Sequence, residues 1–145
     1  MIATDTLHYL NMCDMQGFEW PTNFDLARSK GMVTGLKSTL DTLLPGEVQR
    51  PDAYEAQDCT FFARLRLPVE ISVGNYQSDL YVSNFGDMTA VQNEGFVLPE
   101  YLDTIKRAAE RNGFRWINEA DLLRTYDGKG KWGFSTWWHR FFDYV

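Results

Sequence analysis

The chain has 145 residues, 44% of them hydrophobic, and a net charge of −6. This length is typical of one domain, so we expect a single domain over residues 1–145. The negative charge disfavours direct binding to nucleic acid, because the phosphates would be repelled. No stretch approaches the roughly 18 apolar residues of a membrane span, and the start at Met1 lacks the basic and apolar regions of a signal peptide. These features predict a cytoplasmic protein that does not enter a membrane.

The first part of the chain predicts one strand and one long helix. Residues 6–12 form a short mixed apolar segment, which we interpret as a strand. Thr22 or Asn23 can cap a helix, with Asp25 in its first turn. Apolar residues then recur at helical spacing, at Met32, Val33, Leu36, Leu40, Leu43 and Leu44. Glycine weakens the beginning of this run, so we expect the helix to start near Gly31 and to stop at Pro45.

An acidic segment follows that helix, over residues 45–58. Residues 1–59 together carry a net charge of −5, so the negative charge lies early in the chain. We interpret the segment as a loop whose carboxylates form a partner-binding face, at Glu47, Asp52, Glu55 and Asp58. Association by electrostatic steering needs only such a patch, and its partner would be a basic protein. A solvated loop is the common alternative for a charge run.

The middle of the chain predicts an antiparallel sheet. Apolar and polar residues alternate with a period of two over residues 61–67, 69–73 and 79–84. Residues 84–87 can close a hairpin onto a fourth strand at 88–91.

A second long helix is predicted over residues 99–111, where an apolar stripe has charged residues outside it, and Asn112-Gly113 is a good stop. A short strand over 114–117 and a short helix over 119–123 follow. The predicted fold is therefore α+β: a mainly antiparallel sheet of about four to six strands with two principal helices packed on it.

The end of the chain is rich in aromatic residues, which make up 15% of the whole sequence. Residues 135–136 can cap a final helix. Rings at i, i+4 spacing would then share faces, Trp137 with Phe141 and Trp138 with Phe142. A chain end this apolar either docks on the sheet as core or forms a contact patch. We expect it to close the core.

Candidates for catalysis are few. His139 lies four residues before Asp143, so both can share one helical face, and a carboxylate can orient a histidine for base work. No nucleophile accompanies this pair, and we expect no enzymatic activity. The alternative is a small-molecule-binding or enzymatic domain with a pocket near the aromatic end. Its lining would be Tyr126, Trp132, His139 and Asp143.

Signals for metals and cofactors are weak. The two cysteines, Cys13 and Cys59, and the two histidines, His8 and His139, match no zinc-ligand spacing. The Gly-Lys-Gly-Lys run at 128–131 lacks the pattern of a phosphate-binding loop. We therefore expect no metal and no cofactor.

Four segments of the second half carry a resemblance: Leu80–Gly86, Asn112–Phe114, Leu122–Gly128 and Thr136–Tyr144. Together they resemble small bacterial cytoplasmic proteins, among them immunity proteins of polymorphic or contact-dependent toxin systems. The resemblance implies a non-enzymatic inhibitor that neutralises a toxin domain by direct binding, and it carries over no functional residue. A basic nuclease domain would suit such an acidic protein, since carboxylates can stand in for phosphates. A further alternative is a subunit that self-associates through exposed aromatics.

Overall fold

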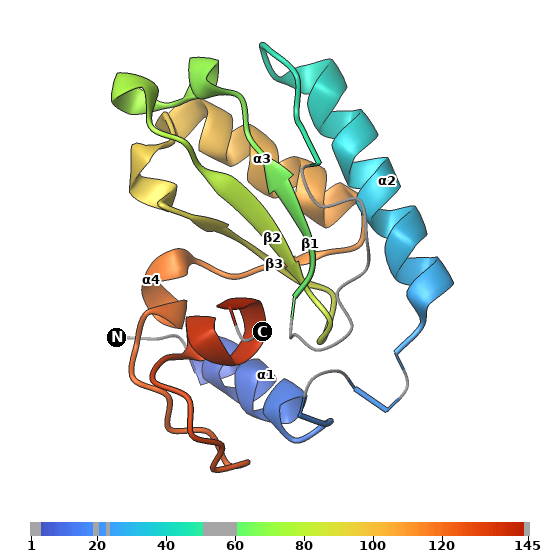
Figure 1. Cartoon of the computed structure of the whole chain (residues 1–145), viewed down its shortest axis with the longest axis vertical. Helices are drawn as coiled ribbons and strands as arrows, with labels where there is room; N and C mark the ends of the chain where they lie inside the picture. The colour runs from blue at the N-terminus through green and yellow to red at the C-terminus, as the bar shows by residue number, and fades with distance from the viewer. Residues whose placement is uncertain (1–3, 19–20, 23, 51–60, 144–145) are drawn as a thin grey trace.

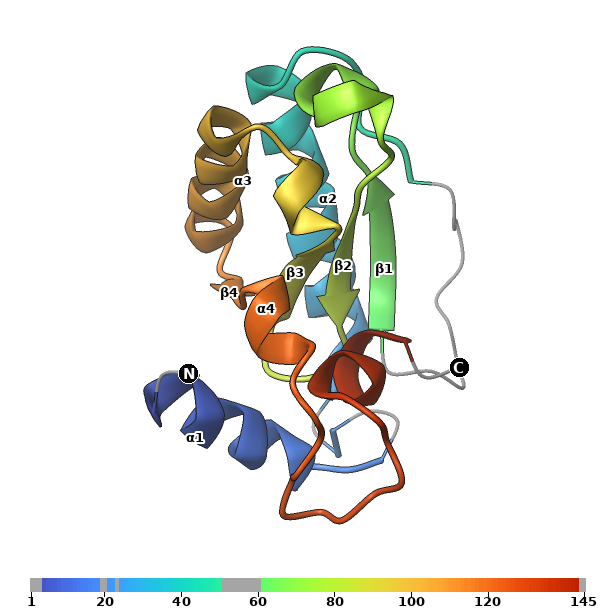
Figure 2. The same ribbon diagram turned by 90° about the vertical axis from the view of Figure 1, so that its left-hand side faces the viewer.

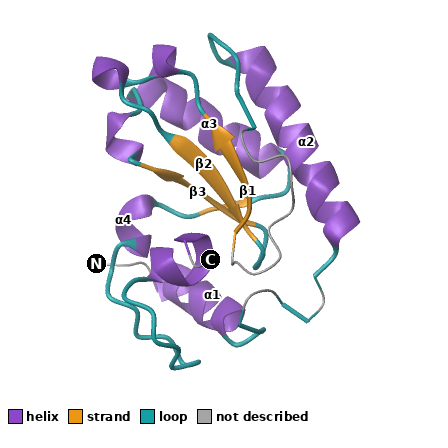
Figure 3. Cartoon of the chain, in the orientation of Figure 1, coloured by secondary structure: helices purple, strands orange, loops and turns teal. Residues whose placement is uncertain are grey.

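The computed structural model describes residues 4–18, 21–22, 24–50 and 61–143 of the chain (Figure 1). Its helices are α1 (Thr4–Asp14), α2 (Leu26–Leu43), α3 (Pro99–Arg111) and the single turn α4 (Glu119–Leu122). Its strands are β1 (Phe61–Arg66), β2 (Asp79–Ser83), β3 (Met88–Gln92) and β4 (Arg115–Trp116). Tight 3-10 turns are η1 (Val69–Ile71), η2 (Val73–Asn75) and η3 (Glu94–Phe96), and η4 (His139–Asp143) is a short π-helix. Figure 3 shows the helices gathered around one sheet, so the predicted α+β class is confirmed.

The sheet has four strands in the order β1-β2-β3-β4. The first three strands pair antiparallel, whereas β4 lies parallel to β3, with Met88 opposite Arg115. The parallel pair arises because α3 is a crossover that returns the chain to the end of the sheet where β3 begins. The sheet is therefore mixed, and the predicted arrangement of a mainly antiparallel sheet with two principal helices matches only roughly.

The turn between β2 and β3 closes the predicted hairpin. The Met88 N–H donates to the Phe85 carbonyl at 3.1 Å, and the central residues Gly86 and Asp87 have φ angles of 59° and 52°. Two left-handed residues are what a type I′ hairpin turn requires. Only glycine fits at position 86, because a Cβ there would lie 2.5 Å from both the Cys13 sulfur and the Tyr9 hydroxyl oxygen.

The strand predicted over residues 69–73 is wrong, because this segment forms the turns η1 and η2. The Ile71 N–H donates to the Pro68 carbonyl at 3.3 Å, and the Ser72 N–H donates to the Val69 carbonyl at 3.0 Å. The alternation of apolar residues is real, but only Ile71 is buried, and the valines beside it are exposed. A local period of two therefore did not indicate a paired strand here.

The strand predicted over residues 6–12 is also wrong, because these residues belong to helix α1. Its buried residues are Leu10, Cys13 and Asp14, which share one helical face. The beginning of α2 likewise differs from the prediction. Asp25 caps this helix by accepting the Arg28 N–H at 3.0 Å, so α2 begins at Leu26 and not near Gly31.

Two hydrophobic cores lie on opposite faces of the sheet. The period of two along β2 separates them, since Leu80 and Val82 belong to the first core and Tyr81 to the second. Helices α2 and α3 cover the first face, whereas α1 and η4 lie at the lower end on the other side (Figures 1 and 2). Between α2 and α3, Gly35 allows a close approach, because a Cβ there would meet the Asn112 side-chain oxygen at 2.9 Å.

The aromatic end of the chain forms much of the second core, as predicted. Trp137, Trp138, Phe141 and Phe142 are each at most 5% exposed. The Tyr81 and Trp138 rings meet edge to face with centroids 5.5 Å apart. Among the residues that the structure describes, no helix has the length and apolar character needed to cross a membrane.

Candidate functional site

The most deeply buried charges of the described residues are Asp14 and Arg140. Both side chains are fully buried, and Arg140 Nε lies 2.7 Å from Asp14 Oδ1. The other guanidinium nitrogens donate to backbone carbonyls, with Phe18 at 2.8 Å and Gly17 at 2.5 Å. The Arg140 guanidinium carbon also lies 4.7 Å from the ring centroid of Phe85. Hydrogen bonds and rings thus compensate the burial of this cation.

The Asp14 carboxylate is also bound by the loop that precedes η4. The Tyr126 hydroxyl donates to it at 2.8 Å, and the Gly130 N–H donates at 2.8 Å. Burial, with this hydrogen bond, raises the pKa of Tyr126 to about 12. The Gly-Lys-Gly-Lys loop therefore encloses a carboxylate of the same chain. Asp14 and Arg140 together connect α1, this loop and η4, which is a structural role.

Two residues of the predicted pocket, Tyr126 and His139, pack against Phe134. Its ring centroid lies 5.8 Å from that of Tyr126 and 5.0 Å from that of His139. Trp132 donates from Nε1 to the Asp14 carbonyl at 3.4 Å. His139 Nδ1 accepts the Ser135 N–H at 3.3 Å. Asp143 is the last residue of η4, and its side chain lies outside the description.

Cys13 is buried beneath the β2–β3 turn. Burial raises the pKa of its thiol to about 11, and burial also raises the pKa of the neighbouring Tyr9 hydroxyl. The Tyr9 hydroxyl donates to the Gly86 carbonyl, and the Arg115 guanidinium lies 4.1 Å from the Tyr9 ring centroid. A thiol with a raised pKa is a poor nucleophile and a poor metal ligand near neutral pH. Cys59 lies outside the described residues.

Metal ligands do not cluster in the described part of the chain: it contains no group of three or more His, Cys, Asp or Glu side chains suited to a metal ion.

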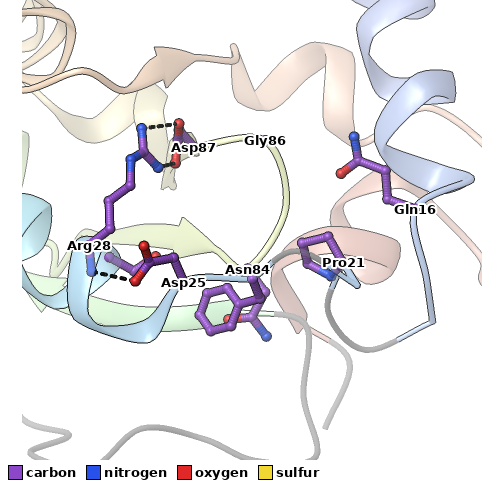
Figure 4. A pocket seen from close by; sticks show the side chains of 9 residues that line it. Gln16, Pro21, Asp25, Arg28, Asn84, Gly86 and Asp87 are labelled. Carbon is purple, nitrogen blue, oxygen red and sulfur yellow. Dashed lines mark hydrogen bonds and ion pairs between the residues drawn. The ribbon is translucent and has the colours of Figure 1, made fainter.

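A polar cleft of about 380 Å³ opens between the first turn of α2 and the β2–β3 turn (Figure 4). An ion pair borders it, because Arg28 NH1 and NH2 donate to the two carboxylate oxygens of Asp87 at 2.8 and 2.9 Å. These hydrogen bonds raise the pKa of Arg28. Gln16, Asp25 and Asn84 lie around the same hollow. The Arg28–Asp87 pair holds the left-handed turn against α2.

Four exposed apolar side chains lie at the opposite end of the molecule, on or directly after the turns η1, η2 and η3. The rings of Tyr76 and Phe96 stack with centroids 4.2 Å apart, although the residues are 55% and 40% exposed. Val69 and Val73 on the neighbouring turns are 39% and 51% exposed. We call these four residues the aromatic patch. The turns η1 and η2 lie at the upper end of Figures 1 and 2, and η3 lies below them.

Carboxylates border the aromatic patch. Glu47 and Glu70 line a cleft of about 230 Å³ that also includes Val69 of the patch. Exposed Glu100 lies in the first turn of α3, which is tied to η1 by the Leu98 N–H donating to the Ile71 carbonyl at 2.9 Å. Of the predicted partner-binding face, Glu47 is therefore placed at this end. Asp52, Glu55 and Asp58 lie outside the described residues.

No protein-family model, curated protein or solved structure matches this chain.

The aromatic patch was missed by the sequence analysis, although signals for it exist. Tyr76 follows the turn residues Gly74 and Asn75, and Phe96 follows Gly95. An aromatic residue directly after a turn is a candidate for exposure, because turns run over the surface. The stacking of Tyr76 on Phe96 joins residues 20 positions apart and has no local signature.

Proposed function

We propose that this chain is a non-enzymatic protein-binding domain whose contact surface is the aromatic patch with its bordering carboxylates. The single observation that carries this proposal is the stacked pair of Tyr76 and Phe96, which is left exposed, whereas the rings of the second core are buried, among them Phe85, Trp137 and Phe141. Exposed aromatic residues on turns are typical anchors of protein interfaces, because they bury large areas at low entropic cost.

The partner in this proposal is a basic protein. Glu47 and Glu70 line a cleft together with Val69 of the patch, Glu100 lies in the first turn of α3, and the chain as a whole carries a net charge of −6. Carboxylates around an apolar centre favour a partner with lysines and arginines, and they accelerate its association. In its narrower form, the proposal is that this chain is a cytoplasmic immunity-type protein. It would neutralise a toxin domain, such as a basic nuclease, by direct binding.

Site-specific photo-crosslinking tests the binding surface. A photoreactive amino acid replaces Tyr76 in one variant and Leu123 in the other. Leu123 directly follows α4 and is 56% exposed, against 55% for Tyr76. We expect a cross-linked protein at position 76 and not at position 123. The captured protein is then purified, and its Kd for the whole chain is measured.

Substitution gives the quantitative result. Tyr76→Ala with Phe96→Ala should weaken binding of the captured protein by at least about 100-fold, the effect of two anchor residues. Leu123→Ala is the matched control and should change Kd less than about twofold. Equal Kd values for all variants would refute the patch as the contact surface. If the chain is an immunity-type protein, its co-expression should protect cells from a toxin domain that a neighbouring gene encodes.

A further inference from the structure

We infer that the partner presents an arginine side chain to the cleft lined by Glu47 and Glu70, beside the aromatic patch. This inference rests on the proposed function and specifies the chemistry of the partner. It commits to arginine rather than lysine, because the cleft contains two carboxylates and apolar residues, and exposed rings lie on the adjoining turns.

The cleft lies between two chain segments. Glu47 and Gln49 follow the end of α2, and residues 67–70 with Gln77 form the opposite wall. The two walls meet closely at Gly46, where a Cβ would collide with a carboxylate oxygen of Glu70 and would lie 2.8 Å from Pro68 Cβ. The glycine therefore allows the Glu70 carboxylate to lie against the loop that carries Glu47.

The charge of the cleft favours a cation. Arg66 also lines it, but Arg66 Nε lies 3.6 Å from Asp79 Oδ1, so that carboxylate offsets its charge. The carboxylates of Glu47 and Glu70 remain as the net charge of the lining. The side-chain amides of Gln49 and Gln77 offer oxygen atoms that can accept further hydrogen bonds.

Arginine fits this combination better than lysine does. Its planar guanidinium carries five donors in a fork that pairs with carboxylates, and it stacks on aromatic rings. The Tyr76–Phe96 pair offers such ring faces, and Gln77 of the cleft follows Tyr76 directly. The methylene groups of the arginine can lie along Val69, which belongs to both cleft and patch. A lysine ammonium is a compact, strongly hydrated charge that gains less from rings.

Three short peptides test the inference on the full chain. Each is acetylated and amidated, with the sequence Gly-Ser-X-Ser-Gly, where X is arginine, lysine or citrulline. Backbone amide signals of Gly46, Glu47, Glu70 and Gln77 are followed by NMR during titration. We expect saturable shifts with the arginine peptide, binding at least about fivefold weaker with lysine, and no saturation with citrulline, which lacks the charge.

Two carboxylate variants give the matched control. Glu70→Gln should weaken the arginine peptide at least about fivefold, whereas Glu110→Gln, the same change of charge on an exposed residue at the far end of α3, should change it less than about twofold. Equal binding of arginine and citrulline peptides, or equal losses in both variants, would overturn the inference. If the peptides fail but Tyr76→Ala still weakens the captured partner, the arginine anchor is wrong and the proposed function stands.

Discussion

At the scale of single residues, Asp14 and Arg140 determine how the end of the chain is fixed. The two charges are 126 positions apart in sequence and have no exposed surface. Removing two ions from water costs several kcal/mol each, and only well-placed partners compensate that cost. The Tyr126 hydroxyl, the Gly130 N–H and the carbonyls around Arg140 supply these partners. Removing either charge should therefore leave the other unpaired in the core.

A double-mutant cycle tests this pair. Asp14→Asn and Arg140→Met should each lower the free energy of unfolding by about 3–5 kcal/mol, the usual effect of leaving one buried charge unpaired. The double variant should lose at least about 2 kcal/mol less than the sum of the two, because it leaves no isolated charge. Urea denaturation of the four proteins measures the coupling.

The exposed pair of Arg107 and Asp103 gives the control for this cycle. Its side chains are 74% and 56% exposed, so Asp103→Asn should cost less than about 1 kcal/mol. Additive losses at Asp14 and Arg140, within about 0.5 kcal/mol, would mean that the two charges do not stabilise one another. The sequence could not predict this pair, because an aspartate just after a short mixed segment and an arginine among aromatic residues each look like surface charges.

At the scale of elements, prediction succeeded where the deciding contacts are local. Helix α3 was predicted with its full range because its apolar stripe and its Asn112-Gly113 stop lie within the element. Helix α1 was mistaken for a strand because its buried face includes Asp14, which a hydrophobic pattern excludes. The segment 69–73 alternates like a strand, yet the structure exposes Val69 and Val73. Such a local conflict is typical of functional surfaces, and these two valines belong to the aromatic patch.

The turn η3 presents Phe96, and Glu119 of α4 holds this turn in place. Its carboxylate accepts the N–H of Asn93 at 2.7 Å and of Glu94 at 3.0 Å. Asn93 has a φ angle of 61°, a left-handed conformation that needs such support. Glu119→Ala should therefore loosen η3, lower the free energy of unfolding by about 1–3 kcal/mol, and weaken the contact between the Tyr76 and Phe96 rings.

Ring-to-ring NOEs and partner affinity measure this effect together. The variant Asp121→Ala removes the same charge two residues further along α4 and should leave the NOEs unchanged. Glu119→Ala with intact NOEs between Tyr76 and Phe96 would show that η3 does not depend on this carboxylate.

At the scale of the whole molecule, the two cores differ in their ionisable groups. Cys13 lies in the second core, and Tyr9 and Tyr126 pack against it. Burial raises the pKa of all three, to about 11 for Cys13 and about 12 for Tyr126. These groups are neutral when protonated, so the folded state favours the protonated form. Their contribution to stability is complete below the pKa of the unfolded chain and is lost as the pH rises through the folded pKa.

Alkaline pH should therefore open the second core before the first. Between pH 8 and pH 10.5, Cys13 alone should remove about 2 kcal/mol from the free energy of unfolding, since its unfolded pKa lies near 9. Fluorotryptophan NMR distinguishes the cores, because Trp137 and Trp138 lie in the second and Trp116 packs against the first. The Trp137 and Trp138 signals should change at lower pH than that of Trp116.

In Cys13→Ala the loss of stability over this pH range should shrink by about 2 kcal/mol. Simultaneous changes of all three signals would instead mean that both faces of the sheet unfold as one cooperative unit. A selective opening would leave the aromatic patch, which rests on the first core, able to bind after the second core has opened.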